Sequence, residues 1–195
     1  MITNTLNPTK IECAKQWVQS AQRVAILTHM SPDGDAMGSS LGLRAWLMLG
    51  GKNAHVIVPN AFPDFFNWMP GAVDDLIYEQ QNKEAEKLLE KADLIICTDF
   101  NEPKRIGSMG DKLMEQVQMK KHTIVIDHHL MVEEKTIPEY EHVIKIVNAE
   151  SPSASELVYR LISQLCQLDD TLPTLSVNAA TCLYTGMMTD TGNFS

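Results

Sequence analysis

The stretch RVAILTHMSPDGDAMGSSLGLRAWLMLGG, residues 23–51, decides the fold class. It opens with a short run rich in Val, Ile and Leu, which is typical of a buried strand. A polar cluster follows, and then an amphipathic segment of helical length that ends at Gly50-Gly51, where glycine can adopt a positive φ angle. This order of strand, polar loop and helix predicts one unit of a parallel α/β sheet.

The same alternation continues along the chain. Predicted strands span residues 23–28, 54–59, 93–98, 122–126 and 143–147. Predicted helices span residues 9–22, 36–50, 82–91, 108–119, 153–167 and 175–189, and Ser151-Pro152-Ser153 supplies caps for the fifth helix. The sequence therefore predicts an α/β fold, a Rossmann-like three-layer sandwich with a mostly parallel central sheet flanked by helices.

The length of 195 residues suits one compact domain. Two interpretations stay open for AFPDFFNWMPG, residues 61–71: a loop packed on the core, or a surface on which a substrate stacks. The polar cluster TDTGNFS, residues 189–195, ends an apolar helix with no element after it to cover it. We therefore expect a truncated chain or a natural fragment.

Composition and charge limit which binding partners and which cellular compartment are expected for this protein. The net charge of −9 argues against binding to long duplex nucleic acid, which needs clustered Lys and Arg. The four cysteines, widely spaced, form no CxxC pair and are expected to be buried thiols. A secretion signal and a membrane-spanning run are both missing from the sequence, so we expect a cytoplasmic protein without a membrane partner.

Acids and imidazoles follow three of the predicted strands directly. His29, Asp33 and Asp35 follow the first strand, Asp99 follows the third, and Asp127-His128-His129 follows the fourth. Ligands of open parallel sheets bind beyond the carboxyl ends of the strands, so these side chains should share one edge. Oxygen donors with a few imidazoles suit two divalent cations, with manganese preferred and magnesium or cobalt as alternatives.

Each cluster also has a simpler interpretation. Asp33-Gly34-Asp35 could be a turn and a helix cap, Asp99 a strand-end cap, and Asp190 the polar end of the last helix. An EF-hand is excluded, because the twelfth position counted from Asp33 is Arg44 instead of an acid.

Histidines separate into two groups by their place on the predicted strands. Two adjacent histidines after an apolar strand cannot both lie on its buried face, so His128-His129 favours function. Apart from His29, which follows the first strand, the others lie at strand starts, opposite the expected site, and are expected to be structural or solvated: His55, His122 and His142.

Taken together, these motifs resemble the DHH phosphoesterase superfamily over nearly the whole chain. Four segments of this chain are similar to the four motifs of that superfamily. They are HMSPDGDAMGSSLGL from His29 to Leu43 for the first motif, the TDF around Asp99 for the second, residues 127–129 for the third, and the TDTGNF that ends at Phe194 for the fourth. The resemblance implies that residues 1–195 are a catalytic domain. It also implies that the family's C-terminal, DHH-associated substrate-binding domain is absent from this chain.

The resemblance further implies a role for each matching residue. One metal ion would be held by His29 and Asp33, the other by Asp35, His128 and Asp190, with Asp99 as the bridge. The resemblance also implies three catalytic residues. Asp99 would bridge the two metal ions, His129 would face the substrate phosphate, and Asp127 would orient His128.

Within the superfamily, the chain looks most like the oligoribonuclease and pAp-phosphatase branch, a resemblance supported by SPSASELVYRLI, residues 151–162. This implies hydrolysis of short single-stranded oligoribonucleotides or of 3′-phosphoadenosine 5′-phosphate (pAp) by a metal-bridged hydroxide. Alternatives are a pyrophosphatase, an exopolyphosphatase, a cyclic-dinucleotide phosphodiesterase, or a non-catalytic metal- or nucleotide-binding module. The oligomeric state stays open.

Overall fold

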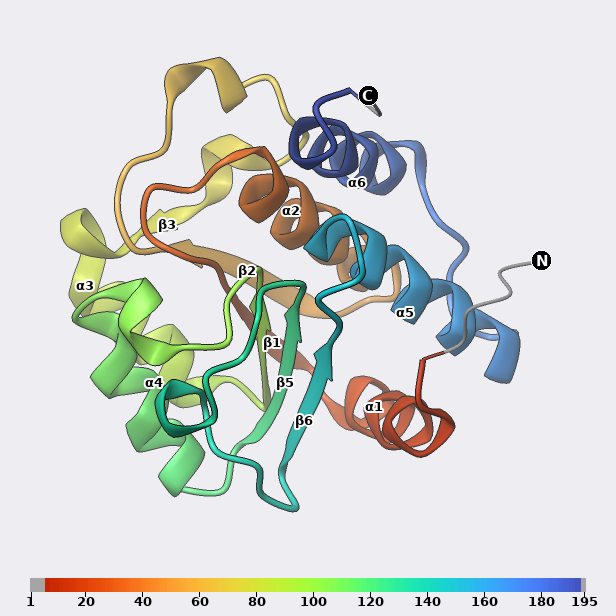
Figure 1. Cartoon of the computed structure of the whole chain (residues 1–195), viewed down its shortest axis with the longest axis horizontal. Coiled ribbons are helices and arrows are strands. Elements are labelled where there is room, and N and C mark those ends of the chain that lie inside the picture. The colour runs from red at the N-terminus through yellow and green to blue at the C-terminus, as the bar shows by residue number, and fades with distance from the viewer. Residues whose placement is uncertain (1–5, 194–195) are drawn as a thin grey trace.

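The computed structural model describes residues 6–193, which form a three-layer α/β sandwich (Figure 1). Within that range the central sheet has six strands, all parallel, in the order β3-β2-β1-β4-β5-β6. The strands are β1 Arg23–Leu27, β2 Asn53–Val58, β3 Leu76–Ile77, β4 Leu94–Thr98, β5 His122–Asp127 and β6 Val143–Val147. This is the strand order of a Rossmann fold, so the predicted fold class is confirmed.

Strand β3 is the element that the sequence analysis missed. It has two residues, Leu76 and Ile77, which pair with the end of β2. Such a segment is too short to show either an apolar run or an alternating pattern. The other five strands begin and end within one residue of the predicted bounds.

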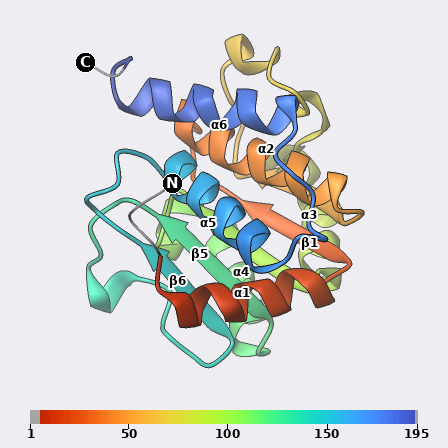
Figure 2. The same cartoon turned by 90° about the vertical axis from the view of Figure 1, so that its right-hand side faces the viewer.

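Two helical layers cover the faces of the sheet. Helices α3 (Tyr78–Lys91) and α4 (Met109–Gln118) cover one face, while α1 (Pro8–Ser20), α2 (Gly34–Leu49) and α5 (Ala154–Leu168) cover the other (Figures 1 and 2). The strands alternate accordingly: in β1, Val24 and Ile26 join the core of the α1, α2 and α5 layer, and Ala25 and Leu27 join the other. Both faces are therefore buried, which explains the continuous apolar runs.

Helix α6 (Val177–Asp190) packs on α2 with close backbone contact (Figure 2). A Cβ atom at Gly38 of α2 would lie 2.6 Å from the carbonyl oxygen of Cys182 and 2.8 Å from the Cα of Gly186. Only glycine leaves room for this approach. The tight contact fixes where the C-terminal end of α6 lies relative to the start of α2.

The ends of two helices lie where the sequence predicts them. Gly51 has a φ of +77° beyond the end of α2, and the Ser153 side chain accepts a hydrogen bond from Glu156 N at the start of α5. Phe194, the last residue of the fourth expected motif, lies outside the described residues. Within residues 6–193, no helix combines the length and hydrophobicity that a bilayer crossing requires.

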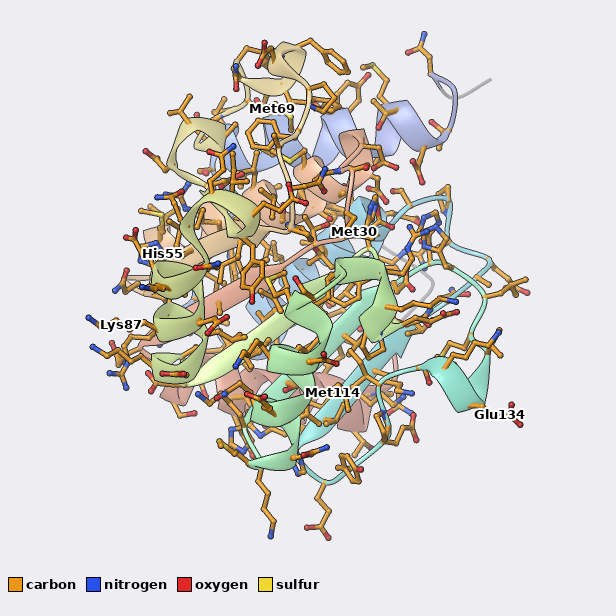
Figure 3. The ribbon with its side chains drawn as sticks, turned by 90° about the vertical axis from the view of Figure 1, so that its left-hand side faces the viewer. Met30, His55, Met69, Lys87, Met114 and Glu134 are labelled. Atoms are coloured by element: carbon orange, nitrogen blue, oxygen red, sulfur yellow. The ribbon has the colours of Figure 1, made fainter. Side chains whose placement is uncertain are left out.

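The 61–71 loop and the isolated histidines take the structural roles expected of them. Phe66 and Met69 are buried, which confirms core packing for that part of the loop, whereas Phe65 and Trp68 are exposed. His55 lies well away from Met30, the residue after His29, in Figure 3 and bonds Asn53.

The other two histidines also make structural contacts. His122 stacks on Trp17 with ring centroids 4.3 Å apart, and His142 Nε2 contacts the Val117 carbonyl oxygen at 2.8 Å. These contacts confirm their structural role.

Candidate metal centre

The expected side chains meet at the carboxyl edge of the sheet, where the strand order reverses. Strands β1 and β4 are neighbours there, although they are far apart in sequence. His29 follows β1, Asp99 follows β4 directly, and Asp127 is the last residue of β5. A doubly wound sheet opens a crevice at such a point, because the connections leave it in opposite directions.

The first group of candidate ligands comprises His29, Asp33 and Asp99. His29 Nε2 lies 3.3 Å from Asp99 Oδ2 and 3.8 Å from Asp33 Oδ2. The other ring nitrogen, Nδ1, lies 2.8 Å from the Met30 carbonyl oxygen, which can only accept a hydrogen bond. Nδ1 therefore carries a proton, and in the neutral ring Nε2 presents a lone pair to the carboxylates, as metal-binding histidines do.

The second group comprises Asp35, His128 and Asp190. His128 Nε2 lies 3.2 Å from Asp190 Oδ2 and 3.8 Å from Asp35 Oδ2. Asp35 is fully buried, and its carboxylate accepts hydrogen bonds from the backbone N–H groups of Ala154 and Ser155 at the start of α5. The helix thus orients the acid while its field favours negative charge there.

Asp99 lies between the two groups. Its Oδ2 faces His29, and its Oδ1 lies 3.4 Å from His128 Nε2. The residue is 1% exposed, and its backbone adopts a φ of +64°, an uncommon value for a non-glycine residue that often marks a functional position. A carboxylate with one oxygen toward each group has the arrangement that a bridging ligand requires.

The electrostatics of the cluster call for additional positive charge. Contacts with Asp190 and Asp99 raise the pKa of His128 to about 11, and burial together with repulsion from Asp99 raises that of Asp35 to about 7. Within residues 6–193, His29 Nε2 and Asp99 Oδ1 are buried atoms that lack a hydrogen-bond partner. Carboxylates packed this closely are stabilised only by protons or by metal cations.

The donor set fits two divalent cations. In each triad, one ligand atom per residue lies within 4.8 Å of the others: His29, Asp33 and Asp99 in one, Asp35, His128 and Asp190 in the other. Oxygen and imidazole donors without thiolate suit manganese or magnesium better than structural zinc.

Asp33 combines the two interpretations that the sequence left open. Its Oδ1 accepts hydrogen bonds from Asp35 N and Ala36 N and caps α2, while Oδ2 points toward His29. Asp190 likewise ends α6 and contacts His128. Capping and metal binding are therefore compatible in Asp33, because a carboxylate has two oxygens, whereas the C-cap of α6 is Thr191, which bonds through its backbone N–H.

The expected partner of Asp127 is wrong. Its Oδ1 accepts from the backbone N–H of His129 at 3.2 Å and lies 2.8 Å from His129 Nδ1, so Asp127 orients His129 instead of His128. The sequence analysis also missed Asn101, which is 3% exposed and donates its side-chain N–H to Asp127 Oδ2. Its position two residues after Asp99 was the available signal.

Comparison with known proteins identifies relatives in sequence and in fold. A curated relative, the bifunctional oligoribonuclease and PAP phosphatase NrnA of Thermus thermophilus, is 32% identical over 88% of this chain and 44% of its own length. An exopolyphosphatase-related protein from Bacteroides fragilis is 44% identical, with a TM-score of 0.87 over 100% of this chain and 53% of the other.

A more distant structure supports the fold alone. RecJ of Thermus thermophilus in complex with Mn²⁺ has a TM-score of 0.58 at 18% identity, over 95% of this chain and 25% of that one. The chain thus spans about half the length, or less, of these relatives. The model of the DHH family, N-terminal domain, matches residues 23–187, and the chain therefore belongs to the DHH family.

Proposed function

We propose that this chain is the catalytic part of a phosphoesterase that uses two divalent cations to hydrolyse small nucleotides, namely short oligoribonucleotides and pAp. One observation carries the proposal: the buried carboxylate of Asp99 faces His29 with one oxygen and His128 with the other. A single carboxylate shared by two ligand groups is the structural basis of a two-metal site.

The ligands would be shared between the two positions as follows. His29 and Asp33 would hold one cation, Asp35, His128 and Asp190 the other, and Asp99 both. Manganese is our first choice, supported by the donor set and by the related fold of RecJ, whose structure is a complex with Mn²⁺. A bound pair supplies Lewis acidity for the phosphate and for the attacking water.

His129 would face the substrate phosphate. Its side chain is 47% exposed, unlike that of His128, and Asp127 holds its Nδ1. Contact with Asp127 also raises the pKa of His129, which favours the protonated ring. Such a ring can donate a hydrogen bond from Nε2 to a phosphate oxygen or to the leaving oxygen.

The choice of nucleotide substrates is supported by the NrnA relative, which is an oligoribonuclease and PAP phosphatase. The exopolyphosphatase-related neighbour keeps inorganic polyphosphate as a second candidate substrate. The free state of all four cysteines accords with the reducing cytoplasm that we propose as the location.

The test compares two variants with the wild-type protein on pAp, a diribonucleotide, pyrophosphate and a cyclic dinucleotide. We expect Asp99→Asn to lose metal occupancy and activity together, since the bridge loses its charge. His129→Ala should keep both metals, measured by calorimetry, while turnover falls by roughly 10²- to 10⁴-fold. Full activity in both variants would refute the assignment.

The same experiment separates an enzyme from a binding module. A non-catalytic module would bind the metal ions and a nucleotide without turnover of any of the four substrates. We expect metal-dependent turnover, with pAp and the diribonucleotide ahead of pyrophosphate.

A further inference from the structure

A cavity of about 420 Å³ opens directly beside His129. Its polar lining comes from Asn101, Glu102, Arg105 and Asp127, and its apolar lining from Phe100 and Leu130. His129 lines this cavity, and its Nδ1 lies 3.5 Å from Oδ1 of Asp99, the proposed bridging ligand. Anything that extends from a phosphate held at His129 can therefore enter the cavity.

Besides His129, the cationic side chain among the residues that line this cavity is Arg105. The sequence contains four arginines, and three of them hold a carboxylate: Arg23 holds Asp93, Arg44 holds Asp74, and Arg160 holds Glu156. Among the side chains that the structure describes, none forms an ion pair or hydrogen bond with the guanidinium of Arg105.

The neighbouring carboxylates act on this guanidinium only through space, because each is bonded to another side chain. Glu102 lies in the same cavity, but its carboxylate pairs with Lys104 Nζ at 2.7 Å. Asp127 is held by Asn101 and His129. Arg105 therefore remains available to an anion from outside the chain.

The backbone holds Arg105 next to the metal centre. It lies in the short helix η3 (Pro103–Ile106), and its carbonyl oxygen accepts from Met30 N at 2.8 Å. Met30 directly follows His29, so the loop with the arginine is tied to the loop with the metal ligand. Gly107, at a φ of +59°, leaves room for Met30, because a Cβ atom there would lie 2.9 Å from Met30 Sδ.

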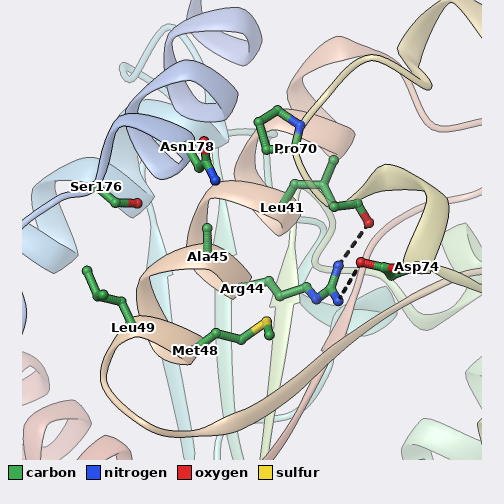
Figure 4. A pocket seen from close by; sticks show the side chains of 10 residues that line it. Leu41, Arg44, Ala45, Met48, Leu49, Pro70, Asp74, Ser176 and Asn178 are labelled. Carbon is green, nitrogen blue, oxygen red and sulfur yellow. Dashed lines mark hydrogen bonds and ion pairs between the residues drawn. The ribbon is translucent and has the colours of Figure 1, made fainter.

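A second cavity of similar size shows the contrast (Figure 4). It measures about 450 Å³, and its arginine, Arg44, already donates to the Gly71 carbonyl oxygen at 2.8 Å and contacts Asp74. That guanidinium is committed to the fold. Of the two cavities, only the one beside His129 offers a cation without a protein partner among the described residues.

We propose that Arg105 binds a second phosphate of the substrate, beyond the one that is hydrolysed. The inference rests on the proposed function, since it assumes that the scissile phosphate lies at the metal centre against His129. A guanidinium forms paired, charge-assisted hydrogen bonds with phosphate. In a chain of net charge −9, such a cation beside the site selects nucleotides with two phosphates over those with one.

The test uses pAp and adenosine 3′-monophosphate, which carry the same 3′ ester but differ in the second phosphate. Arg105→Gln should raise KM for pAp by roughly 10- to 100-fold and leave kcat nearly unchanged, while kinetics with the monophosphate stay within about twofold. Arg105→Lys should recover part of the loss, because lysine keeps the charge without the planar fork. Lys83→Gln is the control, since Lys83 is an exposed cation of α3 that does not line the cavity and is not part of the Lys104–Glu102 ion pair.

Equal losses for both substrates in Arg105→Gln, or the same loss in Lys83→Gln, would overturn the inference. Equilibrium binding of pAp and of the monophosphate to His129→Ala with Mn²⁺ separates this inference from the proposed function. Tighter binding of pAp that depends on Arg105, in a wild-type protein without turnover, would support the subsite and contradict the phosphoesterase. Turnover without any preference for pAp would support the phosphoesterase and contradict the subsite.

Discussion

Replacing Gly38 by alanine tests whether the packing of α6 on α2 positions Asp190. The new Cβ atom would lie 2.6 Å from the Cys182 carbonyl oxygen, whereas ordinary van der Waals contact begins at 3.4 Å. The obstacle is backbone, so α6 has to move by close to an ångström. Overpacking of this kind costs about 1–3 kcal/mol, of which the better helix propensity of alanine offsets up to about 1 kcal/mol.

The consequence for the metal centre should exceed the consequence for the fold. Asp190 Oδ2 lies 3.2 Å from His128 Nε2, and a displaced α6 carries this carboxylate away. We expect the affinity of the site with Asp190 to fall by roughly 10- to 100-fold, as when the support of a ligand is removed. The other site, with His29 and Asp33, should change far less.

Calorimetric titration with Mn²⁺ resolves the two sites, and urea unfolding gives the loss of stability. Gly50→Ala is the control at the C-cap of the same helix, because Gly50 has a φ of −77° and its Cβ would meet its nearest atom, Leu47 O, at 3.3 Å. Unchanged affinity at both sites in Gly38→Ala, with a folded protein, would show that the helix contact does not position Asp190.

Three further substitutions have distinct expected outcomes. Asp33→Asn should keep the stability of the protein within a few tenths of a kcal/mol, because Asn caps helices as well as Asp, whereas Asp33→Ala should lose about 1 kcal/mol; both should weaken Mn²⁺ binding in a titration. Burial raises the pKa of Asp75 well above its usual value, although Arg44 opposes the shift. A raised pKa in the folded state means that stability is full below about pH 4 and declines as pH rises through the folded value, so Asp75→Asn should be more stable than wild type at pH 8 and equal at pH 4 in urea melts. A constant difference across pH would contradict this. Asn101→Ala should lower kcat with Mn²⁺ affinity unchanged, since Asn101 holds the acid that orients His129; a loss of metal instead would place it among the supports of the metal ligands.

The sequence was sufficient to predict the fold and the edge at which the site lies. Strand-length apolar runs such as residues 23–28 are interrupted by polar clusters, and parallel strands bring such clusters to one edge whatever their distance in sequence. The structure brings His29, Asp99 and His128 together at that edge, as expected.

The hydrogen-bond and ion-pair partners of the side chains within the site could not be predicted from the sequence. Asp127 bonds His129 instead of His128 because the chain turns sharply after β5, and residue order alone does not fix that turn. The availability of Arg105 depends on Lys104 taking up Glu102, which is a matter of side-chain geometry. The dual role of Asp33 likewise becomes visible only when each of its oxygens is placed.

The most direct measurement is a crystal structure of the Mn²⁺-loaded protein with anomalous diffraction at the manganese edge. We expect two peaks roughly 3.5 to 4 Å apart, one beside His29 and one beside His128, with an oxygen of Asp99 bound to each. A single peak, or two peaks with Asp99 bound to neither or to only one, would contradict the two-metal account.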